Sequence, residues 1–261
     1  MEQLKMNDEE FKDIYHKYHN EYDAFDYSIL GIGDSYYEND FESIFSIGRE
    51  SNINAVVNSL HDTIEYFIVS KIYMEYAYRT AEQVEISQDE AGFDYYWLFY
   101  YQNITLNHLH TLHDLLYNLV YEEFGLYEIK RDFGFRKNIV NTLRQNEDER
   151  ARGFGSILNK DSPVRTTKYR DEYTHNIKPY RLKYDITKDG NATWGSLSTK
   201  KDYEPGQVNE DIDSDIKKLS KKARKLKTAI LEYRKYKNNK NWWVIIVLVI
   251  FIISASLHIS F

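Results

Sequence analysis

The apolar residues of the chain recur every three or four positions over two long stretches, which is the pattern of helices with one buried face. In the first stretch, from residue 51 to about residue 83, they are Val56, Leu60, Ile64, Phe67, Ile68, Ile72 and Tyr76. In the second, which ends near Gly125, they are Trp97, Tyr100, Ile104, Leu109, Leu112, Leu116, Leu119 and Val120. Only a short polar break at residues 87–90 separates the stretches, so we expect two long helices that pack as an antiparallel hairpin.

Shorter patterns surround this hairpin. Further helices are expected at about residues 8–22, 135–144, 154–158 and 163–176 and from residue 208 onward. The helix at 163–176 is expected because Asp161 and Ser162 precede Pro163, which suits the first helical position. Polar and apolar residues alternate from Leu182, and a turn signal follows at 189–191. This segment predicts a small β-hairpin or extended insertion.

The chain ends in an apolar tail, which begins at Trp242 and contains no Lys, Arg, Asp or Glu up to Phe261. A helix of about 20 residues spans the hydrocarbon core of a bilayer. The paired Trp242 and Trp243 suit the membrane interface, and the Lys/Arg block before them places the N-terminal body in the cytoplasm. We therefore expect a single-pass anchor that contacts membrane lipids. The composition indicates a prokaryotic cell membrane.

Together these patterns predict an all-α fold with a small β-hairpin or extended insertion and a C-terminal transmembrane helix. The expected divisions are an acidic N-terminal segment at 1–48, a helical domain at 49–181, the insertion at 182–207, a basic juxtamembrane helix at 208–240 and a transmembrane anchor at 241–261.

The net charge of −7 on 261 residues is unevenly distributed. Residues 1–129 carry about −19, residues 130–183 about +7 and residues 217–261 about +10. The two basic blocks therefore coincide with the last short helix and with the helix before the tail. Because the chain has no Cys, disulfides, thiolate zinc sites and cysteine nucleophiles are excluded.

The first basic block contains Arg170, Asp171 and His175 in the stretch from Tyr169 to Asn176. At these residues the chain resembles the HEPN superfamily (higher eukaryote and prokaryote nucleotide-binding domains). Its catalytic members carry an Arg, often followed by a polar residue, and then a His after four to six intervening residues. The resemblance spans about residues 50–180. It implies an HEPN-like helical bundle with metal-independent endoribonuclease activity at a site formed by two protomers, without a cofactor.

The residue types suit this chemistry. A neutral imidazole such as that of His175 can take the proton of a ribose 2′-OH and later protonate the leaving oxygen. The guanidinium of Arg170 can bind a phosphate and stabilise its transition-state charge. Arg165, Lys168, Lys178 and Arg181 lie nearby in the sequence and are expected to attract the RNA backbone.

Helix geometry limits how these residues can cooperate. Arg170 and His175 point about 140° apart on a helix, because they are five residues apart. Asp171 and His175 share a face, so Asp171 is the expected partner of the imidazole. The pair of Arg170 and His175 is therefore expected to cooperate best near a helix end or across the two-fold axis of a homodimer.

We expect from this reasoning a membrane-tethered, metal-independent endoribonuclease that acts on RNA. A role in stress response or antiviral (phage) defence is implied by the resemblance alone. The alternative is a non-catalytic membrane-anchored helical scaffold or a nucleotide-sensing module. A metal site of His61, His110 and His113 is a third interpretation, and it is less favoured because no Glu-x-x-His motif accompanies these residues.

Overall fold

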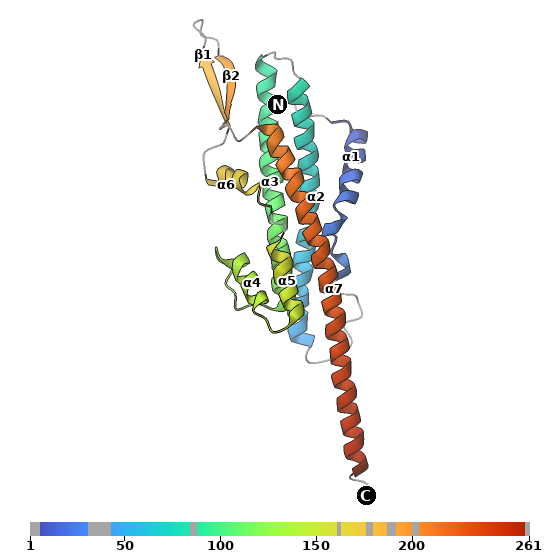
Figure 1. Cartoon of the computed structure of the whole chain (residues 1–261). Coiled ribbons are helices and arrows are strands. Elements are labelled where there is room, and N and C mark those ends of the chain that lie inside the picture. The colour runs from blue at the N-terminus through green and yellow to red at the C-terminus, as the bar shows by residue number, and fades with distance from the viewer. Residues whose placement is uncertain are drawn as a thin grey trace.

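The structure, a computed structural model, describes residues 6–30, 43–83, 88–160, 163–175, 180–186, 192–199 and 204–258. Within these ranges the side chains of residues 29, 43–47, 81–83, 88–95, 172–175, 180–186, 192–199 and 238–258 are not described. The described chain is a helical bundle. Its centre consists of α2 (Ser43–Gln83), α3 (Gln88–Phe124) and α7 (Pro205–His258), as Figure 1 shows.

The predicted hairpin of two long helices is confirmed, because α2 and α3 pack against each other over much of their length. Apolar positions predicted from the spacing are buried, among them Leu60, Phe67, Leu109, Leu112 and Leu116. Ile212, Ile216, Leu219 and Leu226 of α7 complete the same core. The three helices therefore share one hydrophobic core.

The end of α3 is set by a glycine. Gly125 has a φ of 61°, a left-handed conformation that side-chain-bearing residues rarely adopt. The N–H of Leu126 then bonds back to the C=O of Tyr121 at 3.1 Å, as in glycine-terminated helices. The first helix of the hairpin is longer than expected, because α2 begins at Ser43 rather than near residue 51.

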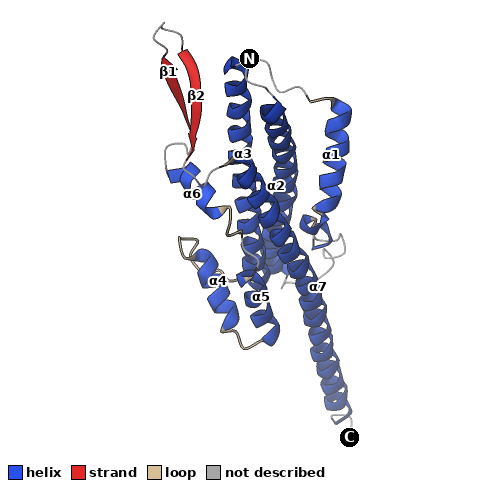
Figure 2. Cartoon of the chain, turned by 45° about the horizontal axis from the view of Figure 1, so that its top comes forward, coloured by secondary structure: helices blue, strands red, loops and turns tan. Residues whose placement is uncertain are grey.

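The acidic N-terminal helix α1 (Asp8–Glu21) packs on α2. Asn7 caps it, since its side-chain oxygen accepts a hydrogen bond from the N–H of Glu9 at 3.1 Å. Two short 3₁₀ helices follow, η1 (Asp23–Phe25) and η2 (Ser28–Leu30). In Figures 1 and 2, α1 lies on the side of the bundle opposite to α4 and α6.

The remaining elements lie on the other side of the bundle. They are α4 (Phe135–Arg144), α5 (Glu149–Asn159), α6 (Thr167–His175) and two antiparallel strands, β1 (Tyr180–Ile186) and β2 (Ala192–Thr199), which are red in Figure 2. Tyr184 of β1 pairs with Trp194 of β2. Helix α4 has the predicted bounds. The prediction that α6 starts at Pro163 is wrong, because Thr166 caps the helix instead: its C=O accepts the N–H groups of Tyr169 and Arg170.

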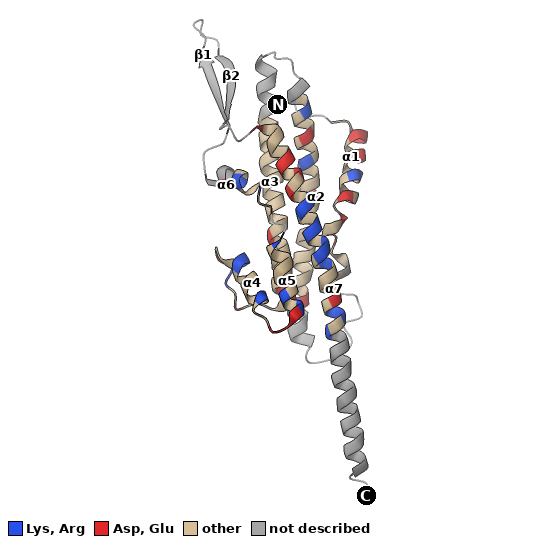
Figure 3. Ribbon diagram, in the orientation of Figure 1, with Lys and Arg blue, Asp and Glu red and all other residues tan. Residues whose placement is uncertain are grey.

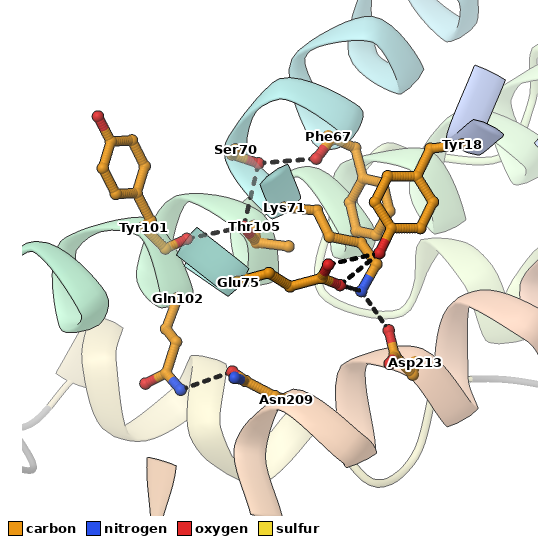
Figure 4. A network of polar contacts seen from close by, with 10 residues as sticks. All are labelled: Tyr18, Phe67, Ser70, Lys71, Glu75, Tyr101, Gln102, Thr105, Asn209 and Asp213. Carbon is orange, nitrogen blue, oxygen red and sulfur yellow. Dashed lines mark hydrogen bonds and ion pairs between the residues drawn. The ribbon is translucent and has the colours of Figure 1, made fainter. Parts of the chain in front are cut away.

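A polar network fixes how α7 lies on α2 and α3 (Figure 4). The buried Lys71 of α2 bonds to Glu75 at 2.5 Å and to Asp213 of α7. Gln102 of α3 donates to Asn209 of α7 at 2.8 Å. Hydrogen bonds need defined distances and angles, so these contacts favour the observed alignment of α7 on α2 and α3. The network therefore sets the position of α7 along the bundle.

Candidate functional site

The start of α6 is anchored to α7 by two buried carboxylates. Asp215 Oδ2 accepts hydrogen bonds from the backbone N–H of Thr166 at 2.9 Å and from its hydroxyl at 3.0 Å. One turn earlier on α7, Asp211 Oδ2 accepts from the Tyr169 hydroxyl at 2.8 Å. All four residues are buried, where an unsatisfied polar group costs about 1–3 kcal/mol. These bonds hold α6 in one place on the bundle.

Arg170 directly follows this anchor. Its Nε and Nη2 donate to Asp171 Oδ1 at 3.1 and 2.8 Å, and its side chain is 29% exposed. We predicted that Asp171 pairs with His175. In the structure Asp171 orients Arg170, its neighbour in the chain. Any contact between Asp171 and His175 stays a prediction, because the side chain of His175 lies outside the described residues.

The predicted RNA-binding residues divide into two groups. Lys178 lies outside the described residues, and so does the side chain of Arg181 in β1. Arg165 is 57% exposed and lies 3.5 Å from Asp211 Oδ1. Lys168 is exposed beside Arg165 on the same segment. The described part of this segment therefore presents two cations to solvent, and their contact with RNA stays a prediction.

His110 of α3 contacts the same anchor. The Thr166 hydroxyl donates its proton to Asp215 Oδ2 and therefore accepts from His110 Nε2 at 3.1 Å. His110 is thus assigned as the Nε2–H tautomer, and its buried Nδ1 has no hydrogen-bond partner among the described groups. Burial, followed by the charges of Arg170 and Arg136, lowers the pKa of His110 to about 4.

His113, one helical turn along α3, lies between two cations. Arg136 Nη1 of α4 is 3.3 Å from its Nδ1, and Lys222 Nζ of α7 is 3.3 Å from its Nε2. Lys222 also donates to the C=O of Leu158 at 2.8 Å. Burial, followed by the charges of Lys222 and Arg136, lowers the pKa of His113 to about 2. The imidazole is therefore neutral at pH 7.

Asp114 completes this surface of α3. Its Oδ1 forms an ion pair of 2.6 Å with Arg136 Nε. Burial raises the pKa of Asp114, while the charges of Arg136 and Arg170 oppose that rise. Helices α3, α4 and α6 thus meet in one group of side chains, which we name the α3 polar cluster: His110, His113, Asp114, Arg136 and Arg170.

The metal interpretation of the histidines finds no support in this geometry. Among the residues whose side chains are described, no three His, Asp or Glu side chains are placed to hold a metal ion. His61 is 64% exposed on α2 and lies 3.7 Å from Asp62. His113 faces cations, which would repel a metal ion.

The sequence singled out Arg170, His110 and His113 for separate reasons, but it did not join them with Asp114 and Arg136 in one cluster. His110, His113 and Asp114 are spaced three and four residues apart, and they interrupt the buried apolar face of α3. That interruption was the only signal that the sequence offered. Nothing in the sequence indicated that Arg136 belongs to the same site.

Residues 53–235 match the sequence profile of Cthe2314-like HEPN domains. The chain belongs to this HEPN family. No curated protein and no solved structure matches it. The matched range begins in α2 and ends in α7, so the HEPN domain includes the α3 polar cluster, α6 and the two aspartates that hold α6. The predicted resemblance to the HEPN superfamily is thereby confirmed.

An apolar tail follows the HEPN domain in the sequence. In the part of the chain with described side chains, no helix is both long and apolar enough to cross a membrane. The predicted anchor, residues 241–261, lies outside that part. Before it, the exposed cations of α7 include Lys217, Lys221, Arg224 and Lys225, and basic residues gather along the middle of this helix in Figure 3.

Proposed function

We propose that this HEPN protein is a metal-independent endoribonuclease with Arg170 and His175 as its catalytic residues. Membership of a superfamily whose catalytic members are ribonucleases supports RNA as the substrate. The observation that carries the proposal is the placement of Arg170. Its guanidinium is oriented by Asp171 on a helix whose start is locked to α7, and catalysis needs such a preorganised charge.

In the proposed reaction, neutral His175 takes the proton of a ribose 2′-OH, and the 2′-oxygen attacks the adjacent phosphorus. The bond from phosphorus to the 5′-oxygen breaks, and the resulting imidazolium returns the proton to that oxygen. Arg170 binds the phosphoryl oxygens, where negative charge increases in the transition state. The products are a 2′,3′-cyclic phosphate and a free 5′-hydroxyl.

The proposed site lies across a homodimer. Arg170 and His175 are five positions apart on α6, and on a helix this spacing corresponds to directions about 140° apart. A two-fold axis beside α6 would bring Arg170 of one protomer to the partner's His175. Arg165, Lys168, Lys178 and Arg181 would bind the flanking phosphates of the RNA.

We further propose that residues 241–261 anchor the protein in the prokaryotic cell membrane as a single span with a cytoplasmic body. The support is the charge-free apolar sequence after Trp242, together with the cations of α7 that precede it and suit anionic lipid headgroups. A role in stress response or antiviral defence is part of this proposal and is supported by family membership alone.

One observation favours the alternative of a non-catalytic scaffold or nucleotide-sensing module. Arg170 and Arg136 are each already paired with a carboxylate, Asp171 and Asp114 respectively. An arginine whose charge is neutralised in this way can serve stability alone. Catalysis must therefore be tested directly.

The test measures cleavage of labelled RNA by the full-length chain, purified in detergent, with excess EDTA. We expect cleavage with cyclic-phosphate ends, and we expect Arg170→Ala and His175→Ala each to reduce it about 10²–10⁴-fold. His61→Ala, which changes an exposed histidine of α2, is the matched control and should retain full activity. A folded, dimeric chain that leaves RNA intact at all concentrations would decide for the non-catalytic alternative.

Mixing the two inactive variants tests the dimeric site. A heterodimer of Arg170→Ala and His175→Ala retains one complete pair if the pair forms across the interface. A statistical mixture should then recover about a quarter of the wild-type rate. If each pair lies within one protomer, no heterodimer has a complete site, and the mixture stays inactive.

A further inference from the structure

Arg136 lies at the solvent edge of the α3 polar cluster and is held on two sides. Its Nε bonds to Asp114 at 2.6 Å and its Nη1 faces His113 Nδ1 at 3.3 Å, while its side chain stays 40% exposed. The guanidinium has five N–H donors in a rigid plane. Two neighbours thus fix its orientation and leave a solvent-facing edge with hydrogens to donate.

Arg170 is one turn along α6 from Thr166, whose hydroxyl bonds to His110 Nε2 of α3 at 3.1 Å, so this part of α6 lies beside α3. The charges of Arg170 and Arg136 both lower the pKa of His110 and of His113, which agrees with this placement. Arg136 is on α4 and Arg170 on α6. Two guanidinium groups from different helices therefore converge on one part of the α3 surface.

The local charges leave an excess of positive charge. Among the side chains that the structure describes in and against the α3 polar cluster, Arg136, Arg170 and the buried Lys222 are cations, and Asp114 and Asp171 are acids. The two histidines between them add no charge at pH 7, because burial keeps them neutral. A site with this excess and two oriented arginines favours a dianion or a phosphodiester over a cation or a neutral ligand.

We propose that Arg136 and Arg170 together form a phosphate-binding site at the junction of α3, α4 and α6, and that it takes a backbone phosphate of single-stranded RNA. Asp114 and Asp171 orient the two arginines, and the phosphate shares or replaces these contacts. His113 is a positioning residue, since it contacts Arg136 and not the ligand. The inference rests on the proposed ribonuclease function for its choice of RNA as the source of the phosphate.

The experiment separates binding from cleavage by using a fluorescein-labelled oligouridylate with 2′-O-methyl groups throughout, which lacks the attacking hydroxyl. Binding to the full-length chain in detergent is measured by anisotropy over a range of salt. We expect Arg136→Gln to weaken binding on the order of tenfold. It should also lower the slope of log affinity against log salt by about 0.7, the value for one lost phosphate contact on a single strand.

Arg79→Gln is the matched control. Arg79 is also a surface arginine with one carboxylate partner, Glu10 at 3.1 Å, but it lies on α2 beside α1. This variant makes the same change in net charge and loses one ion pair, and it should bind within about twofold of wild type because distant charges are screened. Arg136→Lys keeps the charge but loses the planar fork, so intermediate affinity is expected.

Two results would overturn the inference. The first is equal binding by Arg136→Gln and Arg79→Gln. The second is Arg136-dependent binding of ATP without any effect on the oligonucleotide, which would assign the site to a free nucleotide. RNA cleavage together with the first result refutes the phosphate site and leaves the ribonuclease proposal intact. Arg136-dependent binding without any cleavage of unmodified RNA would support the phosphate site and refute the ribonuclease proposal.

Discussion

Thr166 donates both its backbone N–H and its hydroxyl to a single oxygen of Asp215, at 2.9 and 3.0 Å. The two residues are 49 positions apart in the chain. The same hydroxyl accepts from His110 Nε2. One threonine side chain thereby joins α3, the start of α6 and α7.

Replacing Thr166 with Val should destabilise the protein by about 1–3 kcal/mol, because His110 Nε2 and one bond of Asp215 lose their partner at nearly constant volume. Thr166→Ser keeps the hydroxyl and should cost much less. Urea denaturation followed by circular dichroism measures both. Equal losses for the two variants would mean that the methyl group, and not the hydroxyl, is what matters at this position.

The glycines of α5 should respond in opposite directions. A Cβ on Gly155 would lie 3.0 Å from Arg144 Cγ and 3.2 Å from the C=O of Val140, whereas one on Gly153 would meet nothing within 4 Å. We expect Gly155→Ala to destabilise by about 1–3 kcal/mol by forcing α4 and α5 apart. Gly153→Ala should stabilise by about 0.5–1 kcal/mol through helix propensity. Thermal denaturation provides the comparison, and the same sign for both variants would refute this account of the contact.

Stability should fall as the pH is lowered from about 6.5. His110 and His113 have a lowered pKa in the folded state, about 4 and about 2, so between pH 6.5 and those values the unfolded chain binds more protons. The stabilisation is therefore complete above the unfolded pKa of about 6.5 and is progressively lost below it. At pH 5 each histidine should account for a loss of about 2 kcal/mol.

The free energy of unfolding in urea at pH 7.5, 6 and 5 measures this dependence. His113→Asn should be less stable than wild type at pH 7.5 but should lose less on acidification, because it cannot take up the proton. His61→Asn, at an exposed position, should retain the wild-type slope. A His113→Asn chain with an unchanged slope would show that His113 is not kept neutral by folding.

Lys71 should contribute far more to stability than an exposed cation with a similar ion pair. It is 2% exposed and bridges Glu75 and Asp213, which are 33% and 44% exposed. Lys71→Met should cost about 2–4 kcal/mol, somewhat less than in a fully buried site because water can solvate the two carboxylates. Arg79→Met, at the exposed pair with Glu10, should cost under about 1 kcal/mol. Chemical denaturation compares them, and equal effects would contradict a bridging role for Lys71.

The sequence was informative where local chemistry determines structure. The bounds of α4 and the end of α3 at Gly125 followed from apolar spacing and from a residue suited to positive φ. The start of α6 was wrongly placed at Pro163, since its true cap, Thr166, is held by a carboxylate from α7. A contact over that distance in the chain leaves no local pattern.

The candidate site was predictable only in part for the same reason. Arg170 and Asp171 stand next to each other and were found from their motif. His113 owes its environment to Arg136 and Lys222, which are 23 and 109 residues away. In the sequence, His110 and His113 suggested a metal site. In the structure both are buried at this junction, and burial keeps them neutral beside arginines.

Helix α7 continues without a break from Pro205 to His258, so its length sets the distance between the site and the tail. At 1.5 Å per residue, Asp215 and Trp242 are about 40 Å apart along it. If the tail inserts in a bilayer as proposed, Arg170 stands well clear of the headgroups. An RNA would then be engaged from the aqueous side, at a height that the length of one helix determines.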